Sequence, residues 1–386
     1  MLKVFRITAI ISVLITALFA NNTFGVTFTE IQLVPDGSHS ADEISIGIKG
    51  DNTVAIAYTD ASRHIKYGIY NPQASSFSSQ TVLTTVTTDY MGMSLDSNYN
   101  PHVTYLTKDS NYAYVNYIYN DGTAWSAPEV AYKRSSTQHN VMQPWRTVAF
   151  DSNDNPYISY NLHISSTYTQ LGYTYKNGSS WTNKTVQFGS NQPGIHAMTI
   201  DNNDDVHFAY STLNPGTLYT EINGSNNQMV ATNLYHGDAH GMATSATGNP
   251  VVIYENSRLM LLEKTGASWN SNNAITLGTL TNPYAADIAV DANGYYHVAA
   301  VYSNYKYYYY TNISGSWESQ YIGEYNYHFY GFDIEVTPDG KPVIGYVSDD
   351  GVMLLMDADL ASVPEPASLI LLGLSLAGLI RKRLRK

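Results

Sequence analysis

The chain has 386 residues, a formal net charge of −12 at pH 7 and no cysteine. Its acidity argues against binding to nucleic acid or to an anionic membrane surface, because both need basic patches. Without cysteine the fold has no disulfide bond, and no cysteine nucleophile is available. Seven of the 20 basic residues lie in the first 25 and last 25 positions, so the part between them is more acidic still.

Residues 1–25 have the pattern of a secretory signal peptide. Lys3 and Arg6 form a charged start, and an apolar run follows from Ile7 to Ala20. That run is short for a membrane span. We therefore predict export, with cleavage after Ala20 or Gly25.

The body, residues 26–361, repeats one pattern seven times. Each copy has a hydrophobic–x–hydrophobic strand, a turn of Asp, Asn or Gly, and a second strand that closes on tyrosine; one clear copy runs from Met93 to Tyr105. The closing residues are Tyr58, Tyr105, Tyr160, Tyr210, Tyr254, Tyr302 and Tyr346. Steps of 44–55 residues made of short strands predict a β-propeller and argue against a solenoid of helices.

Each repeat supplies four strands. The third and fourth are joined by a turn that ends in tryptophan, at Trp125, Trp181, Trp269 and Trp317. The last repeat lacks that turn and its fourth strand, whereas the strand predicted at Thr27–Val34 has no repeat of its own. We therefore predict an all-β, seven-bladed β-propeller of four-stranded blades as a single domain, in which the N-terminal strand closes the last blade and leaves no open edge.

The loops of such a ring sort onto two faces. The turns that join strands one and two, and strands three and four, are short and repetitive, and we call their side the turn face. The other loops are longer and irregular; we call their side the loop face, and such loops usually carry binding residues. His102, His207 and His297 occupy a repeated slot and are predicted to be structural. The other eight histidines map to the loop face: His39, His64, His139, His163, His196, His236, His240 and His328.

A candidate site lies at the mouth of the central channel on the loop face. Trp145 is the one tryptophan outside the repeat, and it directly precedes Arg146 at the end of the longest loop between blades. The residues expected at this mouth are Glu43, Tyr90, Trp145, Arg146, His196 and His240, with His139 and His163 in support. Trp stacks on sugar rings, Arg pairs with carboxylate or sulfate, and His donates or accepts protons near neutral pH. We therefore predict a polyhydroxylated ligand; a solvated rim without a ligand is the alternative.

Two patterns could hold a metal, although we predict neither a metal nor a cofactor. Turns such as Asp96-x-Asn98-x-Asn100 resemble calcium loops, but they lack the glycine and the bidentate Glu of such loops, and plain hairpin turns explain them. A histidine-rich site could be formed by His236 and His240 with His139, His163 or His196.

The period and the Gly-x-x-Trp turn resemble those of sialidase-like, BNR-type propellers. The Ser-x-Asp-x-Gly-x-x-Trp motif of that family is absent, because Asp121 directly precedes Gly122. The resemblance also implies three arginines at the channel, and Arg146 is the only one well placed. Sialidase activity is therefore disfavoured.

At the C-terminus, Val363-Pro364-Glu365-Pro366 is followed by an apolar run over 367–380 and a basic run over 381–386. This arrangement resembles the PEP-CTERM sorting signal of Gram-negative bacteria. The resemblance implies that an exosortase-type enzyme recognises Pro364, Glu365 and Pro366 and that the segment 362–386, with its hydrophobic transmembrane helix, is removed. It also implies export to the cell surface or extracellular matrix, often in strains that make exopolysaccharide. Membrane contact is then expected only through the signal peptide and this helix, before processing.

These observations favour an exported propeller that binds carbohydrate, as exopolysaccharide, without catalysis. One alternative is a polysaccharide lyase with His196 or His240 as base, Tyr90 as acid and Arg146 as carboxylate neutraliser. The other is a structural or protein-binding propeller. Convergence of His, Tyr and Arg in one pocket would favour the enzyme, and a shallow rim of separate aromatic rings would favour binding.

Overall fold

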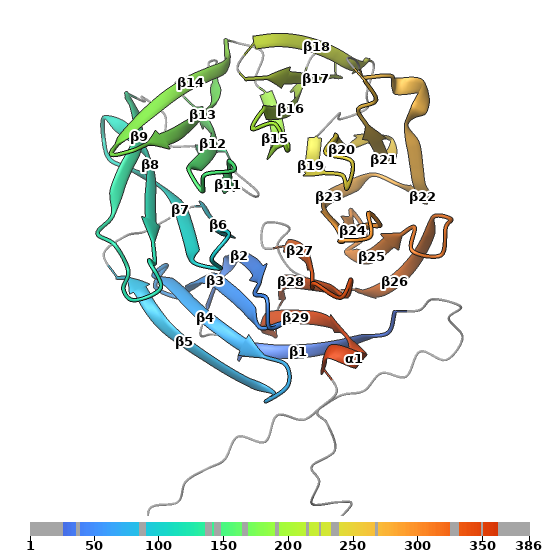
Figure 1. Ribbon diagram of the computed structural model, residues 1–386, viewed down its shortest axis with the longest axis horizontal. Helices are drawn as coiled ribbons and strands as arrows, with labels where there is room; N and C mark the ends of the chain where they lie inside the picture. The colour runs from blue at the N-terminus through green and yellow to red at the C-terminus, as the bar shows by residue number, and fades with distance from the viewer. Residues whose placement is uncertain are drawn as a thin grey trace, which may run out of the picture.

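The computed structural model describes residues 26–35, 39–84, 90–135, 141–142, 148–163, 169–189, 193–213, 216–223, 225–232, 239–266, 269–324, 332–348 and 350–361. The predicted signal peptide and the predicted C-terminal helix lie outside these residues. Within them, the strands form seven sheets, six of four strands and one of five. Figure 1 shows the sheets following one another around a common axis.

The sheets follow chain order, and we number them accordingly. Sheet 1 contains β2 (His39–Ile48), β3 (Val54–Asp60), β4 (Ile65–Asn71) and β5 (Ser76–Leu83). Sheet 2 contains β6 (Tyr90–Leu95), β7 (Pro101–Lys108), β8 (Tyr112–Tyr119) and β9 (Glu129–Ser135). Sheet 3 contains β10 (Val141–Met142), β11 (Val148–Phe150), β12 (Pro156–His163), β13 (Thr169–Asn177) and β14 (Ser180–Gly189). Sheet 4 contains β15 (Pro193–Ile200), β16 (Val206–Leu213), β17 (Gly216–Ile222) and β18 (Ser225–Thr232).

The remaining sheets continue in the same way. Sheet 5 contains β19 (Ala239–Thr244), β20 (Pro250–Asn256), β21 (Arg258–Glu263) and β22 (Ile275–Thr281), with the 3-10 turn η1 (Ser271–Asn273) before β22. Sheet 6 contains β23 (Pro283–Val290), β24 (Tyr296–Tyr302), β25 (Lys306–Thr311) and β26 (Glu318–Glu324). Sheet 7 contains β27 (Phe332–Val336), β28 (Pro342–Ser348), β29 (Gly351–Asp357) and the N-terminal β1 (Phe28–Pro35); the helix α1 (Ala358–Ala361) follows β29.

Sheet 7 joins the two ends of the described chain. β1 pairs antiparallel with β29, from Phe28 opposite Asp357 to Pro35 opposite Gly351. The strand order is β1-β29-β28-β27, so β1 is the outer strand of this sheet. The pairing predicted for Thr27–Val34 with the last strand of the chain is therefore present.

One turn geometry recurs where the innermost strands end on the turn face. Asp96 accepts the backbone N–H of Asn98 at 2.9 Å and that of Asn100 at 2.7 Å, and Asp151 and Asp201 bind their own turns in the same way. Asn, Asp and Gly tolerate the left-handed backbone region. The Asp-x-Asn repeats are therefore explained as hairpin turns. In each turn between the first two long strands of a sheet, the fourth residue is left-handed, with φ of 59–85°: Asn52, Tyr99, Asp154, Asp204, Gly248, Gly294 and Gly340.

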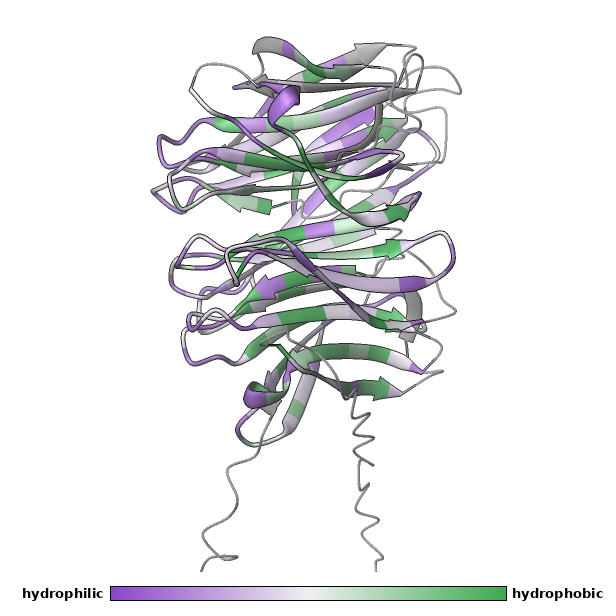
Figure 2. Cartoon of the chain, turned by 90° about the vertical axis from the view of Figure 1, so that its right-hand side faces the viewer, coloured by the Kyte–Doolittle hydropathy of each residue, from purple (hydrophilic) through white to green (hydrophobic). Residues whose placement is uncertain are grey.

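Hydrophobic packing fills the space between neighbouring sheets. One cluster contains Ala197 of sheet 4 and Met242 of sheet 5, for example. Figure 2 shows hydrophobic colour along the strands and hydrophilic colour at many of the loops. In the run 307–310, Tyr307, Tyr309 and Tyr310 are buried and contribute to this packing. Five closing tyrosines are at most 2% exposed: Tyr160, Tyr210, Tyr254, Tyr302 and Tyr346.

Buried carboxylates link the innermost strands of sheets 6, 7 and 1. Asp333 on β27 accepts the N–H of Ile46 at 2.8 Å and the hydroxyl of Ser45 at 3.0 Å, both on β2. Asp287 on β23 accepts the N–H of Ile334 on β27 at 3.2 Å. The last sheet is thus joined to the first near the axis as well as through β1.

Candidate functional site

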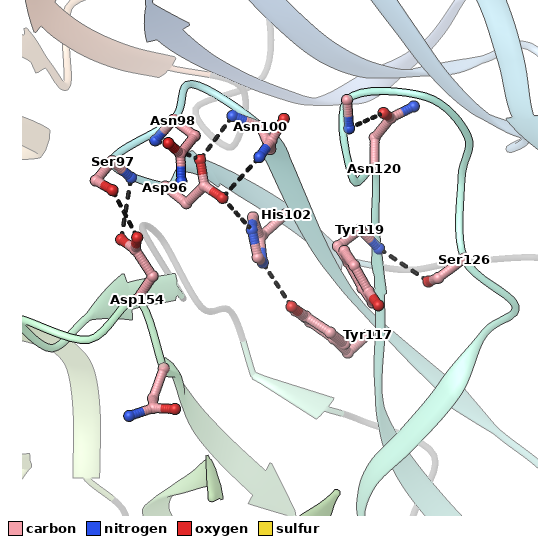
Figure 3. A network of polar contacts seen from close by, with 12 residues as sticks. Asp96, Ser97, Asn98, Asn100, His102, Tyr117, Tyr119, Asn120, Ser126 and Asp154 are labelled. Carbon is pink, nitrogen blue, oxygen red and sulfur yellow. Dashed lines mark hydrogen bonds and ion pairs between the residues drawn. The ribbon is translucent and has the colours of Figure 1, made fainter. Parts of the chain in front are cut away.

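The histidines of the repeated slot belong to buried polar networks on the turn face. His102 Nδ1 lies 2.5 Å from the Tyr117 hydroxyl, and its Nε2 lies 3.4 Å from Asp96 Oδ2. Figure 3 shows this network, in which Asp96 also holds the turn through Asn98 and Asn100. The network ties three successive strands of sheet 2 together.

The same slot is filled similarly in two other sheets. His207 Nε2 lies 2.9 Å from Asp201 Oδ2, and His297 Nδ1 lies 2.6 Å from the Tyr309 hydroxyl. Burial lowers the pKa of His102, His207 and His297, although the neighbouring aspartates oppose that shift. The structural role predicted for these three histidines is confirmed.

Five of the candidate or loop-face residues lie outside the described part of the chain: His139, Trp145, Arg146, His236 and His328. Two others are described through their backbone. His39 lies in β2 opposite Asp60, and His163 lies in β12 opposite Thr169. His64 is partly exposed, with Nδ1 3.3 Å from Asp60 Oδ2, so it belongs to a local ion pair.

His196 and His240 lie inside the molecule. They are 1% and 2% exposed, and none of their four ring nitrogens has a hydrogen-bond partner among the described residues. The His196 ring stacks on Phe208 at a centroid distance of 5.7 Å and an angle of 13°. Burial lowers the pKa of His196 to about 3 and that of His240 to about 4. Both rings are therefore neutral at physiological pH.

This burial corrects the expectation that both imidazoles line an accessible rim. Successive side chains of a strand point to opposite sides. His196 stands two residues before the buried Met198 in a regularly paired stretch of β15, so the two share one side of the strand. In β19 the register shifts between Ala239 and Gly241, so alternation does not fix the side of His240. Parity was therefore a sequence signal for the burial of His196 and not for that of His240.

Glu43 and Tyr90 are the predicted mouth residues that the described structure brings together. Glu43 is buried, and its carboxylate accepts the N–H of Met91 at 3.1 Å, next to Tyr90 in the chain. Tyr90 begins β6 opposite Leu106 and is half-buried. Glu43 therefore links sheets 1 and 2, and Tyr90 retains surface at the loop face.

A cavity of about 280 Å³ lies among the innermost strands, toward the turn face. Its described lining contains no Lys, Arg or His. The described part of this lining therefore offers no cation to pair with an acidic sugar. Its wall includes Met93, Met198, Met242, Thr199, Asp333 and Glu335.

Metal and membrane features are limited in the described structure. Within those residues, no three His, Asp or Glu side chains are placed to hold a metal ion. Over the same residues, no helix is long and apolar enough to cross a membrane. His139 and His236 of the possible histidine-rich site lie outside them.

Exposed tyrosines on the loop face were not found from the sequence. Tyr112 at the start of β8 is 38% exposed, Tyr284 in β23 is 43% exposed, and Tyr305 just before β25 is 42% exposed. With 34 tyrosines in the chain, composition hides which ones face solvent. Their position beside the loops after β7, β22 and β24 was the available signal.

Comparison with known proteins gives the fold and one motif. No curated protein matches the chain. A streptogramin B lyase is 9% identical with a TM-score of 0.56, over 86% of this chain and 98% of that one. A mutant Aleuria aurantia lectin in complex with Fucα1-6GlcNAc is 12% identical with a TM-score of 0.50, over 75% and 97%. The Hadza microbial sialidase Hz136 is 10% identical with a TM-score of 0.49, over 79% and 73%. The structural likeness to the lyase and the lectin shows an all-β, propeller-like fold, and identities this low show nothing about activity.

The C-terminal segment carries the motif. Residues 362–386 match the PEP-CTERM protein-sorting motif, whose Pro364, Glu365 and Pro366 stand at the start of the segment. That motif marks proteins for export, which agrees with the signal-peptide pattern of residues 1–25. The chain therefore carries a PEP-CTERM sorting signal attached to a propeller-like body.

Proposed function

We propose that the chain is an exported cell-surface or extracellular protein that binds carbohydrate, in the form of exopolysaccharide, without cleaving it. Residues 1–25 are the signal peptide, residues 26–361 are the binding body, and residues 362–386 are the sorting signal. An exosortase-type enzyme recognises Pro364, Glu365 and Pro366 and removes the hydrophobic helix that anchors the protein transiently in the inner membrane. The PEP-CTERM match supports this route.

The body is proposed to be a closed, seven-bladed β-propeller, with each sheet as one blade. Support comes from the seven sheets in chain order and from the pairing of β1 with β29. Asp333 adds a polar link from β27 to β2. Closure of this kind covers β29, which would otherwise be the exposed edge of the last sheet, and suits a protein without disulfides outside the cell.

The observation that carries the binding proposal is the exposure of tyrosine rings on the loop face. Tyr112, Tyr284 and Tyr305 are 38–43% exposed, and they belong to sheets 2 and 6. Exposed rings at separate places on one face suit stacking against the apolar faces of successive sugars, because each ring offers a flat apolar surface with a polar tip. The lectin that shares the fold, solved with Fucα1-6GlcNAc, supports the same class of ligand.

The binding site is proposed at the channel mouth on the loop face. Trp145 stacks on a sugar ring and Arg146 pairs with an acidic substituent, with Tyr90, His139 and His163 in support. The buried rings of His196 and His240 offer a ligand no surface. We propose that they support this region only by packing behind it.

A polysaccharide lyase is the second candidate; a streptogramin B lyase shares the fold, although its name points to no sugar substrate. Its proposed base, His196 or His240, would have to reach substrate. The burial of both rings speaks against that role. Analysis of glycan products after prolonged incubation distinguishes the two candidates, because a binding protein releases none.

The test is glycan-array binding of the exported protein, followed by variants at the site. Trp145→Ala should weaken binding by about 1–3 kcal/mol, as loss of an aromatic anchor does. Arg146→Ala should weaken binding of acidic glycans in particular. His102→Ala is the control, because it should lower stability without changing the affinity of the folded fraction. Binding that is unaffected by both Trp145→Ala and Arg146→Ala would refute the proposed site.

A further inference from the structure

Two tyrosine rings lie together at the start of β8 on the loop face, and we call Tyr112 and Tyr114 the tyrosine pair. They stand two residues apart where the pairing of β8 with β9 is regular, so both rings lie on one side of the strand. Their ring centroids are 6.2 Å apart at an angle of 52°, within aromatic contact range. Tyr112 is 38% exposed, and Tyr114 is partly buried. One ring of the pair is therefore accessible to a second molecule.

A carboxylate holds the phenol of the less exposed ring. The Tyr114 hydroxyl donates to Asp109 Oδ2 at 2.5 Å, the length of a charge-assisted O–H···O⁻ bond. Asp109 Oδ1 accepts the backbone N–H of Asn111 at 2.7 Å and that of Tyr112 at 2.8 Å. The bond from Tyr114 and those from the loop backbone lower the pKa of the Asp109 carboxyl, so it is ionised at neutral pH. The bond to Asp109 raises the pKa of the Tyr114 phenol, so that phenol keeps its proton.

This arrangement favours the loss of one electron from Tyr114. A phenol that loses an electron becomes a strong acid, and its oxidation is easier when a base accepts the proton in the same step. Asp109 is placed as that base, because its Oδ2 already accepts the hydrogen bond of the proton that must leave. The backbone hydrogen bonds to Oδ1 hold the carboxylate in position for the transfer. Tyr114 and Asp109 together therefore have the geometry of a redox-active tyrosine with its proton acceptor.

Two other tyrosines bond to carboxylates but are less accessible. The Tyr346 hydroxyl donates to Glu30, and Tyr346 is 0% exposed. The Tyr296 hydroxyl donates to Glu263 at 2.9 Å, and its partly buried ring is stacked on Trp317 at a centroid distance of 6.0 Å. The tyrosine pair differs from both because an exposed ring lies in contact range of the phenol that is bonded to a carboxylate.

We propose that the tyrosine pair is an oxidative cross-linking site that joins two copies of the protein through Tyr112, with Tyr114 as the first residue oxidised. The oxidant is hydrogen peroxide acting through a haem peroxidase. The chain has 34 tyrosines and no cysteine, so a covalent link between exported copies cannot be a disulfide. This inference goes beyond the proposed function, because it needs the protein to be exported and needs no glycan.

The electrons and protons balance over two copies of the protein. In each copy, Tyr114 gives one electron to the oxidant and its proton to Asp109. Tyr112 then gives an electron to Tyr114, which takes its proton back, and the Tyr112 phenol loses its own proton to water. Two Tyr112 radicals form a carbon–carbon bond between ring positions ortho to their oxygens, and the protons on those carbons move to the oxygens through solvent. Peroxide takes up two electrons and two protons, its O–O bond breaks, and two water molecules result.

Lys133 should restrain the second step. Its Nζ lies 5.2 Å from the centroid of the Tyr112 ring. A cation over a ring is attracted by the electron density of the ring, and oxidation removes part of that density. Lys133→Ala should therefore make Tyr112 easier to oxidise and raise the cross-linking rate about two- to fivefold, the factor that corresponds to an exposed cation–π contact.

The test treats the exported protein with a haem peroxidase and a limiting amount of hydrogen peroxide. Dimers are followed on denaturing gels and by dityrosine fluorescence, and mass spectrometry identifies the linked peptides. Tyr112→Phe should remove most of the dimer, whereas Tyr114→Phe and Asp109→Asn should slow its formation about tenfold or more, because the proton-coupled step is lost. Matched controls are Tyr321→Phe, which changes a 41% exposed ring on β26, and Lys184→Ala, which removes an exposed cation on β14. Both controls should cross-link as the unaltered protein does.

Three results would overturn the inference. The first is that the unaltered protein forms no dimer, and the second is that Tyr112→Phe forms dimers as fast as Tyr321→Phe. The third is that Asp109→Asn reacts as fast as the unaltered protein, because the carboxylate is then not the proton acceptor. Faster cross-linking of Lys133→Ala than of Lys184→Ala supports the inference, and equal rates count against it. The phenylalanine variants keep their rings, and the midpoint of thermal unfolding of each variant separates a lost reaction from a lost fold. None of these results depends on glycan binding, so the proposed function is tested separately.

Discussion

Acidification from pH 7 to pH 5 should destabilise the protein through His196 and His240. Both rings are buried without a described hydrogen-bond partner, and burial lowers their pKa from 6.5 to about 3 and about 4. In the unfolded chain they return to the ordinary value. The unfolded state therefore binds protons below about pH 6.5 while the folded state does not, so stability is present above that pH and is lost as pH falls.

The magnitude follows from the size of the two shifts. One pKa unit corresponds to about 1.4 kcal/mol. At pH 5 the unfolded imidazole is about 1.5 units below its pKa, so each histidine should cost about 2 kcal/mol relative to pH 7, and the pair about 4 kcal/mol. The predicted pH range stops at pH 5 because carboxylates, with unfolded pKa values near 4, change the stability mainly below that pH.

The assay is urea unfolding at pH 7, 6 and 5, comparing the protein with the double variant His196→Leu and His240→Leu. The variant should lose most of the pH dependence contributed by these two residues. At pH 7 it should be at least as stable, because a buried polar group without a partner costs about 1–3 kcal/mol. His102, His207 and His297 remain in the variant and should leave a smaller slope. An unchanged slope between pH 7 and pH 5 would refute the reasoning.

Three further outcomes are expected. Deleting residues 26–35 should expose β29 as an edge and lower the midpoint of thermal unfolding followed by circular dichroism, whereas an unchanged midpoint would contradict closure through β1. Asp333→Ala should destabilise by about 1–3 kcal/mol in urea unfolding, because the buried Ile46 N–H loses its acceptor while the Ser45 hydroxyl can still donate to the Met93 carbonyl, and Asp333→Asn should cost less. Replacing residues 364–366 with alanine should retain the protein in the membrane fraction, and normal release to the outside would contradict the sorting signal.

The repeat made the strands and the first-to-last pairing predictable. Two signals carried this result: turn residues recur where the backbone must be left-handed, as at Asp154 and Gly248, and hydrophobic residues alternate along each strand. The roles of His102, His207 and His297 were predictable because a slot that is repeated must serve packing or turns. These features are local and periodic, so one sequence displays them.

The candidate site was less predictable, because it depends on which side of a strand each residue faces. The loop position of His196 and His240 suggested a rim, but both rings are buried; parity with Met198 accounts for His196, and a register shift at His240 hides its side from the sequence.

The position of β29 has a mechanical consequence for a protein held by its C-terminus. β29 has seven register pairs with β1 and six with β28, and the N–H of Ala358 donates to the Thr27 carbonyl at 2.6 Å just beyond it. A pull on residue 361 therefore loads a strand that is bonded on both flanks. Such a force acts in shear and must break the hydrogen bonds of β29 to β1 and to β28 together. An edge strand, by contrast, would peel away one hydrogen bond at a time. If the protein is pulled at residue 361 before the sorting signal is removed, sheet 7 should therefore resist opening more than a sheet pulled by an edge strand.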